Sequence, residues 1–352
     1  MTEQDILQQA IPKLIAWYRE NRREMPWRRD KNPYHVWLSE TMLQQTRIET
    51  VIPYYERFLQ ELPTVEDLAA LPEDKLMKMW EGLGYYSRAR NLKKTAETVV
   101  ADYGGTFPQK ASELRQLAGI GEYTAGAISS IAFGQPEPAV DGNVLRVYMR
   151  LIACGDDVLN AKTKARVTEE LRTLYPTGEE ASDLTEGIME LGEIICLPNG
   201  MPHCAACPLR DICQAHLTNS TESYPFRSPK KERRKEERTV LLLSYDGTYA
   251  ICRRENKGLL AGMWEFPNVS GKLSADDIRE MLEQQGIEID VCAPCGKAKH
   301  IFTHVEWHMT GYRVKCKNKA PSYKWKTPEE IQKDYAIPSA FRYYTGLIVT
   351  PE

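Results

Sequence analysis

Apolar residues recur at helical spacing over the first 215 residues of the chain. Near the N-terminus, Ile6, Ile11, Leu14, Ile15 and Tyr18 follow the spacing of three and four residues that places side chains on one face of a helix. No alternation typical of a strand is sustained in this part of the chain. We expect helices from Pro33 to about 46, two within 63–100 that flank a loop at 80–90, and others at 123–132, 144–153, 162–174 and 184–192.

The pattern changes after residues 217–238, a polar segment rich in Lys, Arg and Glu and interrupted by Pro. Such composition is typical of a linker between domains. From Thr239 the apolar residues alternate as in strands. We expect a β-hairpin at 240–245 and 249–253, a helix at 274–285, and strands at 301–303 and 308–315.

The length of the chain supports this division. Single hydrophobic cores rarely grow beyond ~250–300 residues, and the chain has 352. The sequence therefore predicts a mainly α domain at 1–216, a linker at 217–238, and an α+β domain at 239–352.

Charge and hydrophobicity exclude two classes of protein. The formal net charge is -3, so nucleic-acid binding through a basic surface over the whole chain is excluded and any such binding is local. No apolar run reaches the ~18–20 residues of a membrane span, and the N-terminus lacks the basic and apolar regions of a signal peptide. We expect a cytoplasmic protein with no membrane partner.

Four of the nine cysteines fall within 18 residues, with the spacing C-x7-C-x2-C-x5-C. In a chain without a secretory signal, this spacing favours ligation of a metal or cluster over disulfides. Four thiolates hold either a tetrahedral zinc ion or a [4Fe–4S] cluster. The single wide gap favours the cluster, because zinc sites usually pair two short hairpins. The expected ligands are Cys196, Cys204, Cys207 and Cys213.

Three further segments carry candidate chemistry. Gly119-Ile120-Gly121 opens a helix whose backbone N–H groups are suited to holding a phosphate, although such turns also simply join helices. Glu40 lies among apolar neighbours, which predicts partial burial and a raised pKa if it is not a solvated helix-face residue. The loop 80–90, with two glycines, two tyrosines and two arginines, suits either insertion into a base stack or a helix–helix turn with inward tyrosines.

These segments occur in the order found in one family. Ser39–Arg47, Gly82–Tyr86, Gly119–Tyr123, Val140–Val144 and the clustered cysteines together resemble the MutY-type adenine DNA glycosylases of the helix-hairpin-helix superfamily. The resemblance implies a mainly α helix-hairpin-helix glycosylase domain with a cluster loop, plus an α+β Nudix-like C-terminal domain. It departs from the family in the first cysteine gap, which is seven residues here and usually six.

The resemblance implies a reaction and its residues. Glu40 is expected to protonate adenine at N7, while Asp141 stabilises the oxocarbenium-like sugar. Tyr123 and Asn143 are expected to support the intermediate. The two acids then need environments that separate their pKa values. Endonuclease III-type enzymes carry a lysine where this chain has Tyr123, so we expect base excision without an efficient lyase step.

The resemblance also implies contacts with duplex DNA, from which the target base must be flipped out. Gln45 and Tyr85 match the intercalating positions, with Thr46, Leu83 and Gly84 nearby. Gly119, Ile120 and Gly121 match the phosphate-binding hairpin. The adenine pocket positions correspond to Trp27, Arg28 and Glu186.

The C-terminal domain is similar to the Nudix-like domain that inspects the base opposite adenine. Phe302-Thr303-His304 matches the motif that reads 8-oxoguanine, with Thr303 in place of Ser. A remnant of the Nudix box at 279–287 has Gln284 in place of a metal-binding Glu, so nucleotide hydrolysis is not expected.

The function implied is that of a monomeric DNA repair glycosylase. It is expected to excise adenine mispaired with 8-oxoguanine or G in duplex DNA, to carry a [4Fe–4S] cluster, and to act at the bacterial nucleoid. The alternatives are an endonuclease III-like bifunctional glycosylase/lyase, a non-catalytic DNA-binding module and a nucleotide-sanitising hydrolase.

Overall fold

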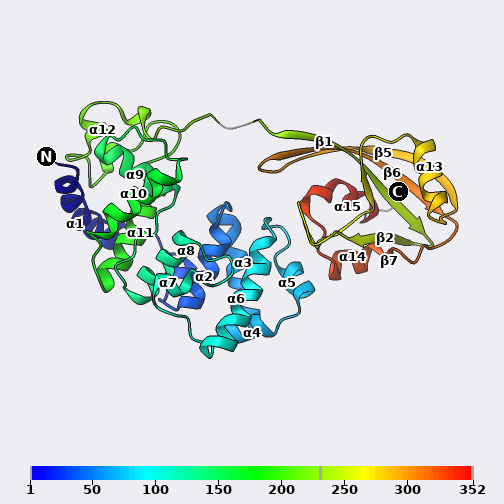
Figure 1. The fold of residues 1–352 in the computed structure, drawn as a ribbon, viewed down its shortest axis with the longest axis horizontal. Coiled ribbons are helices and arrows are strands. Elements are labelled where there is room, and N and C mark those ends of the chain that lie inside the picture. Colours follow the sequence, from blue (N-terminus) through cyan, green and yellow to red (C-terminus); the bar gives the residue numbers. More distant parts are fainter. Residues whose placement is uncertain (1, 230–231, 350–352) are drawn as a thin grey trace. The chain divides into compact units, whose positions relative to one another are not determined.

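The computed structural model describes residues 2–229 and 232–349 (Figure 1). Met1, residues 230–231 and residues 350–352 lie outside the described residues. These positions include the outer ends of the two expected domains and part of the expected linker. The described residues form two compact units: residues up to 70 with 91–229, and residues 71–90 with those from 232 onward. The second unit thus includes a segment that the expected boundary at 216 assigns to the first domain.

The first unit is helical, as the apolar spacing predicts. Local signals set several helix starts: Thr2 forms a capping box with Asp5, and Asn32 caps the helix that opens at Pro33. Its elements, together with the two in which residues 71–90 of the second unit take part, are α1 (Glu3–Asn21), η1 (Pro26–Arg28), α2 (Pro33–Leu43), α3 (Ile48–Glu61), α4 (Val65–Ala70), α5 (Glu73–Met79), α6 (Ser87–Tyr103), α7 (Ala111–Leu114), α8 (Glu122–Ala127), the π-helical η2 (Ile128–Ala132), α9 (Gly142–Ile152), α10 (Ala161–Arg172), α11 (Glu179–Ile194), η3 (Cys204–Ala206), α12 (Gln214–Leu217) and η4 (Thr221–Ser223).

Two helix predictions need correction. The segment 63–100 holds three helices, α4, α5 and α6, where two were expected. The expected loop 80–90 ends at Tyr86, because Ser87 already begins α6. Among the described helices, none combines the length and the hydrophobicity that crossing a bilayer requires.

The core that positions the site lies between α1, α9 and α11. Leu14, Tyr148 and Leu184 are among its buried residues. Helix α9 is buried along almost its whole length. Even its charged side chains Arg146 and Arg150 are buried. A helix that is buried on all sides holds the residues at its N-terminus in fixed positions.

The second unit is built on a mixed sheet with the order β3-β2-β1-β6-β5, in which β4 pairs with β1 and β7 with β2. The two long central strands, β1 and β6, run parallel, and β5 and β6 form an antiparallel hairpin. The elements are β1 (Arg234–Tyr245), β2 (Thr248–Arg253), β3 (Trp264–Glu265), β4 (Asn268–Ser270), α13 (Ala275–Gln284), β5 (Ile289–Ile301), β6 (Val305–Cys316), β7 (Lys324–Lys326), α14 (Pro328–Asp334), η5 (Ser339–Phe341) and α15 (Arg342–Val349).

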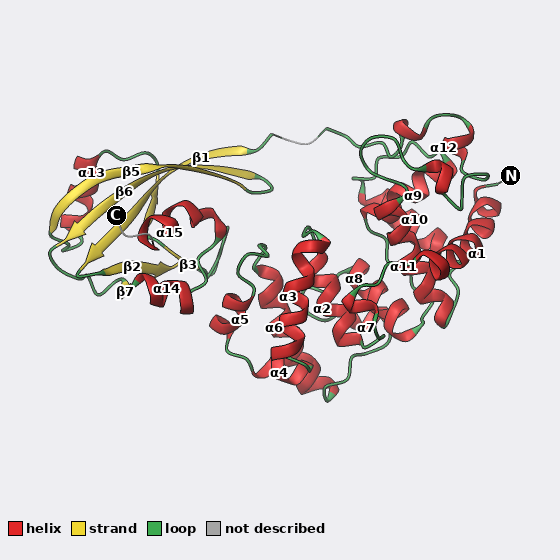
Figure 2. Cartoon of the chain, turned by 180° about the vertical axis from the view of Figure 1, so that it is seen from behind, coloured by secondary structure: helices red, strands yellow, loops and turns green. Residues whose placement is uncertain are grey.

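Alternate residues of β1 face two different cores. Val240 and Leu242 pack with residues of α14, η5 and α15, whereas Leu241 and Leu243 pack under α13. The sheet therefore has helices on both faces, as Figure 2 shows.

Three strand predictions need correction. β1 begins at Arg234, within the segment expected as linker. Residues 301–303 are not a strand: β5 ends at Ile301, and Phe302–His304 form the turn into β6. The length of β5, which begins at Ile289, was not expected. The hairpin at Asp246-Gly247 and the helix after Ser274 are confirmed.

Candidate active site

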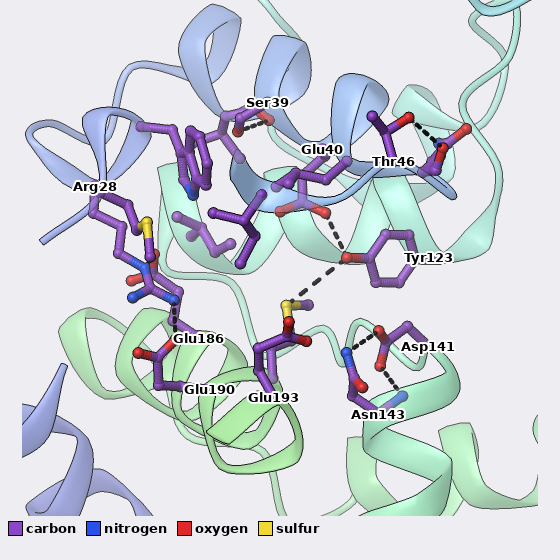
Figure 3. A pocket seen from close by; sticks show the side chains of 18 of the residues that line it. Arg28, Ser39, Glu40, Thr46, Tyr123, Asp141, Asn143, Glu186, Glu190 and Glu193 are labelled. Carbon is purple, nitrogen blue, oxygen red and sulfur yellow. Dashed lines mark hydrogen bonds and ion pairs between the residues drawn. The ribbon is translucent and has the colours of Figure 1, made fainter. Parts of the chain in front are cut away.

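A pocket of about 560 Å³ opens in the first unit between α2, α8, α11 and the N-terminus of α9 (Figure 3). This volume lies within the range of ordinary small-ligand sites. The pocket brings together residues from sequence positions up to 170 residues apart. The expected site residues that line it are Trp27, Arg28, Glu40, Gln45, Thr46, Tyr123, Asp141, Asn143 and Glu186.

Glu40 is a buried acid of the pocket with a raised pKa. It lies on α2 with 7% of its surface exposed, and burial raises its pKa to about 7. The Tyr123 hydroxyl donates a hydrogen bond to its Oε2, which opposes the rise, while the charge of Asp141 adds to it. Near pH 7, Glu40 therefore holds a proton in about half of the molecules.

Asp141 lies across the pocket and is held by backbone donors. As N-cap of α9, it accepts hydrogen bonds from the backbone N–H groups of Asn143 and Val144, each at 2.8 Å, and from Asn143 Nδ2 at 3.0 Å. Burial raises its pKa, and these three hydrogen bonds oppose the rise. They are made to the carboxylate form, so they favour a negative charge at this position.

Arg146 fixes the orientation of Asn143. Its Nη2 donates to Asn143 Oδ1 and to the Gly192 carbonyl, both at 2.8 Å, and its Nε donates to the Cys196 carbonyl at 2.7 Å. Because Asn143 Oδ1 accepts from Arg146, its Nδ2 must face Asp141. The chain of contacts links the cysteine-rich loop to Asp141.

A network of charges forms another wall of the pocket. Arg28 contacts Glu186 at 3.3 Å and Glu190 at 2.9 Å. Glu190, which is 1% exposed, also binds Arg23 through both carboxylate oxygens. The hydroxyl of buried Tyr18 donates to Glu186 Oε2 at 3.0 Å. These contacts hold Arg28 and Glu186 in fixed positions at the pocket.

The expected phosphate-binding hairpin forms a tight turn before α8. Gly119 has φ +74°, and a Cβ there would lie 2.6 Å from Asn91 Cβ, so only glycine fits. Gly121 is the N-cap of α8 in extended conformation and needs no such freedom. Ile120 is buried, so this residue offers a ligand only its backbone.

Gln45 and Tyr85, the two expected intercalating residues, share an uncommon backbone conformation. Gln45 has φ 57° and Tyr85 has φ 45°, a region that non-glycine residues seldom adopt. Such conformations cost of order 1–3 kcal/mol and cluster at functional sites. Tyr85 is 47% exposed, whereas Leu83 beside it is buried.

Within the second unit, Tyr85 contacts the turn that joins β5 and β6. Its hydroxyl lies 3.0 Å from Thr303 Oγ1. Arg88 donates to the carbonyls of Leu83 and Gly84 at 2.8 and 3.1 Å, and its guanidinium lies 5.6 Å from the centre of the Tyr85 ring. Arg88 thereby holds the loop that presents Tyr85.

The four clustered cysteines line one cavity behind α9 and α11. Arg150 lies at its edge and donates to Cys196 Sγ at 3.3 Å and to the Leu197 carbonyl at 2.8 Å. Among the residues that the structure describes, no three His, Cys, Asp or Glu side chains converge as ligands of a single metal ion.

Comparison with known proteins agrees with this geometry. Residues 38–177 match the family model described as HhH-GPD superfamily base excision DNA repair protein, and residues 238–345 match the NUDIX domain. The chain is 32% identical over 402 residues to an adenine DNA glycosylase of Homo sapiens, with 95% of this chain and 73% of that protein covered.

The chain belongs to the adenine DNA glycosylase family. It is also 32% identical to the adenine DNA glycosylase of Buchnera aphidicola subsp. Baizongia pistaciae (strain Bp), with 83% of this chain and 82% of that protein covered. The solved structure of a thermostable thymine-DNA glycosylase matches the chain with a TM-score of 0.56 and 30% identity, covering 61% of this chain and 98% of that one.

Family membership agrees with the resemblance drawn from the motifs. The helix-hairpin-helix match spans Glu40, Tyr123 and Asp141, and the NUDIX match spans Phe302–His304. The fold expected for each part, helical and α+β, is confirmed.

Several residues that hold the pocket together were not expected from the sequence. They are Tyr18, Arg23, Arg146, Met189 and Glu190, of which Met189 lies 3.8 Å from the Tyr123 hydroxyl. The signal for Arg146 was present as a charged residue on the buried face of α9, since a fully buried charge requires partners.

Proposed function

We propose that this protein excises adenine mispaired with 8-oxoguanine or G in duplex DNA, as a monofunctional and monomeric repair glycosylase. The observation that carries the proposal is Glu40, a buried carboxyl with a pKa of about 7 that faces Asp141 across the pocket. Hydrolysis of an N-glycosidic bond needs a protonated leaving base and a negative charge beside the developing sugar cation.

Glu40 is the proposed general acid. Its raised pKa keeps a proton available at neutral pH, where an exposed glutamate has lost its proton. The proton passes to N7 of the flipped adenine, after which the Glu40 carboxylate accepts a proton from the attacking water. Tyr123, which donates to Glu40 Oε2, keeps the carboxyl oriented toward the pocket.

Asp141 is the proposed stabiliser of the oxocarbenium ion. Its three hydrogen bonds favour the ionised form, and Asn143 holds the carboxylate in place. The electrostatic attraction of a fixed carboxylate for a cation is strong in a buried pocket, because little solvent screens it.

Adenine binding is proposed to use the opposite wall. Arg28 and Glu186 present a donor and an acceptor to the edge of the base, and Trp27 supplies an apolar surface. Gln45, with Thr46 next to it in the chain, is proposed to enter the base stack. Tyr85, with Leu83 and Gly84 in its loop, is proposed to do the same. The Gly119–Gly121 turn holds a phosphate of the same duplex through backbone N–H groups.

The turn at Phe302–His304 is proposed to read 8-oxoguanine. Thr303 and His304 are exposed at the end of the β5–β6 hairpin, and the Thr303 hydroxyl lies 3.0 Å from that of Tyr85. The pair of hydroxyls offers donors and acceptors to the edge of the opposite base.

The cysteine cavity is proposed to hold a [4Fe–4S] cluster. Its four thiolates line one cavity, and the buried cation of Arg150 lies beside Cys196 to balance their charge. A zinc ion needs four sulfurs ~2.3 Å from one point, whereas each thiolate of a cluster binds its own iron. The dispersed sulfurs among the described residues therefore fit the cluster better. Bound there, a cluster would cross-link the loop whose Cys196 carbonyl contacts Arg146.

Single-turnover release of adenine tests the proposal. We expect the fastest release from duplexes with adenine opposite 8-oxoguanine, slower release opposite G, and little opposite C or T. Glu40→Gln is expected to abolish release while leaving binding to the 8-oxoguanine duplex intact. Equal rates on all four duplexes would refute the proposed specificity.

Borohydride trapping separates excision from strand nicking. A phenol does not form the Schiff base of a lyase, so Tyr123 predicts no rapid covalent DNA adduct with sodium borohydride. Efficient trapping by the native protein would favour the bifunctional alternative.

A further inference from the structure

One face of the sheet in the second unit changes character along its length. Residues of β1, β6 and β5 that pair in register share a face, so Thr239, Thr310 and Lys297 lie in one row and Glu237, His308 and Lys299 in the next. Farther along the same face, Leu241 and Leu243 are buried under α13. Helix α13 covers the half of this face that is distant from the Phe302–His304 turn, and the segment before it covers Thr239, whose hydroxyl bonds the backbone of Gly271 and Leu273. The β5 and β6 residues of the two rows are left uncovered.

The uncovered half is a basic groove of about 390 Å³. Three lysines line it: Lys297 and Lys299 on β5, and Lys272, which lies before α13. All three are exposed. We call it the lysine groove; its lining residues are Glu237, Lys272, Lys297, Ala298, Lys299, His308, Met309 and Thr310.

Two of the three lysines in the groove form no ion pair with the described residues, and Glu237 is the one carboxylate among the lining residues. Lys299 forms an ion pair with Glu306 at 2.7 Å, and Glu306 also binds His308 Nε2 at 2.7 Å. Within residues 2–229 and 232–349, Lys272 and Lys297 form no salt bridge within 4 Å. An uncovered sheet face with unpaired cations fits a polyanion, whereas a protein partner usually requires an apolar centre.

We propose that the lysine groove binds the phosphodiester backbone of duplex DNA on one side of the base that the Phe302–His304 turn reads. This inference rests on the proposed function, because it takes that turn as the position of the lesion. The groove extends the DNA contact beyond the active-site pocket.

The strand geometry gives the position of the contact. At ~3.3 Å per residue, Lys297 lies about 13 Å along β5 from Ile301, where the strand ends, and the turn adds up to two residues to reach Thr303. A DNA strand advances ~3.4 Å per nucleotide along the helix axis. With β5 laid along the duplex axis, the phosphate that Lys297 contacts lies about four to six nucleotides from the lesion.

The protein-side test removes the two unpaired lysines, Lys272→Ala and Lys297→Ala, in the full chain. The slope of log K against log[salt] is negative, and each lost phosphate contact makes it less steep by ~0.9. For the double variant we therefore expect a slope that is less steep by about 1.8. If the affinities converge at 1 M salt, the double variant binds about 60-fold more weakly at 0.1 M. Lys333→Ala, an exposed lysine on α14 at the other face, is the control and should leave the slope unchanged.

The DNA-side test uses the native protein and neutral methylphosphonate linkages. Placed four to six nucleotides from 8-oxoguanine, on one of the two arms, they should weaken binding by the native protein and have little effect on the double variant. Linkages within two nucleotides of the duplex end serve as the control. A double variant with the native salt slope, or native binding that no arm substitution weakens, overturns the proposal.

The two proposals fail in different ways. If the groove proposal is wrong, the native protein still excises adenine opposite 8-oxoguanine, and the double variant binds the duplex as the native protein does. If the proposed function is wrong, the native protein shows no preference for that duplex, while removal of the lysines still lowers the salt slope.

Discussion

The raised pKa of Glu40 predicts that its charge destabilises the native protein at neutral pH. A shift from 4.5 to about 7 corresponds to about 3 kcal/mol at ~1.36 kcal/mol per pH unit. Since the folded protein binds the proton more tightly than the unfolded chain, the free energy of unfolding falls as pH rises from 4.5 to 7. The stabilisation that the bound proton provides is fully present below pH 4.5 and is lost above pH 7.

Glu40→Gln removes this ionisation and keeps an oxygen that accepts the hydrogen bond from Tyr123. We expect the variant to match the native protein near pH 4.5 and to be about 3 kcal/mol more stable at pH 8. For a helical unit of this size, thermal midpoints rise by about 2–4 °C per kcal/mol, so the difference at pH 8 is about 6–12 °C.

Thermal unfolding from pH 4.5 to 8.5, with iron content and adenine release measured on the same samples, checks the prediction. Glu193→Gln, an exposed carboxylate of the same pocket, is the matched control and should change the midpoint little at any pH. If Glu40→Gln is as stable as the native protein at pH 8, or less stable, then Glu40 is not desolvated and the argument for its role as acid fails.

Three further outcomes are expected. Tyr123→Phe removes the hydrogen-bond donor that holds the pKa of Glu40 down, so the pH above which adenine release declines should rise. A pH–rate profile of single turnovers measures this pH. An unchanged profile would contradict the contact between Tyr123 and Glu40. Gly192→Ala places a Cβ about 2.7 Å from Asn143 Cβ, which should cost 1–3 kcal/mol or displace Asn143, with adenine release slowed and duplex binding kept. Cys207→Ser should lose iron and its visible absorption, whereas stoichiometric zinc in the native protein would overturn the cluster assignment.

The spacing of apolar residues predicted that the first part of the chain is helical, but it did not separate α4 from α5 or give the start of α6. Amphipathic helices such as α1 and α3 bury a face that the chain itself specifies, and local caps such as Thr2 before α1 and Asn32 before α2 set helix starts. The strands were harder to predict. β5 extends from Ile289 to Ile301 because it pairs with β6 over this length. The sequence of β5 shows no clear alternation of apolar and polar residues, so no local pattern predicted its length.

The motifs identified the family, and the resemblance supplied the two candidate acids, Glu40 and Asp141, together with Tyr123. Residue types alone left Glu40 undecided between a buried acid and a solvated one. Its burial depends on the packing of α2 against α8 and η2, about 80–90 residues farther along the chain, which no local pattern records.

The sequence by itself therefore determined which parts of the chain form helices and where the turn at Gly119 lies, because these depend on neighbours in the chain. It also supplied the candidate acids. Only the tertiary structure decided which form of each acid is favoured. Burial raises the pKa of Glu40, whereas three hydrogen bonds oppose the rise that burial causes at Asp141. Arg146 orients the amide of Asn143 toward Asp141 and also contacts the cysteine loop. A pKa depends on the solvent and charges around a group, and folding brings these from distant parts of the chain.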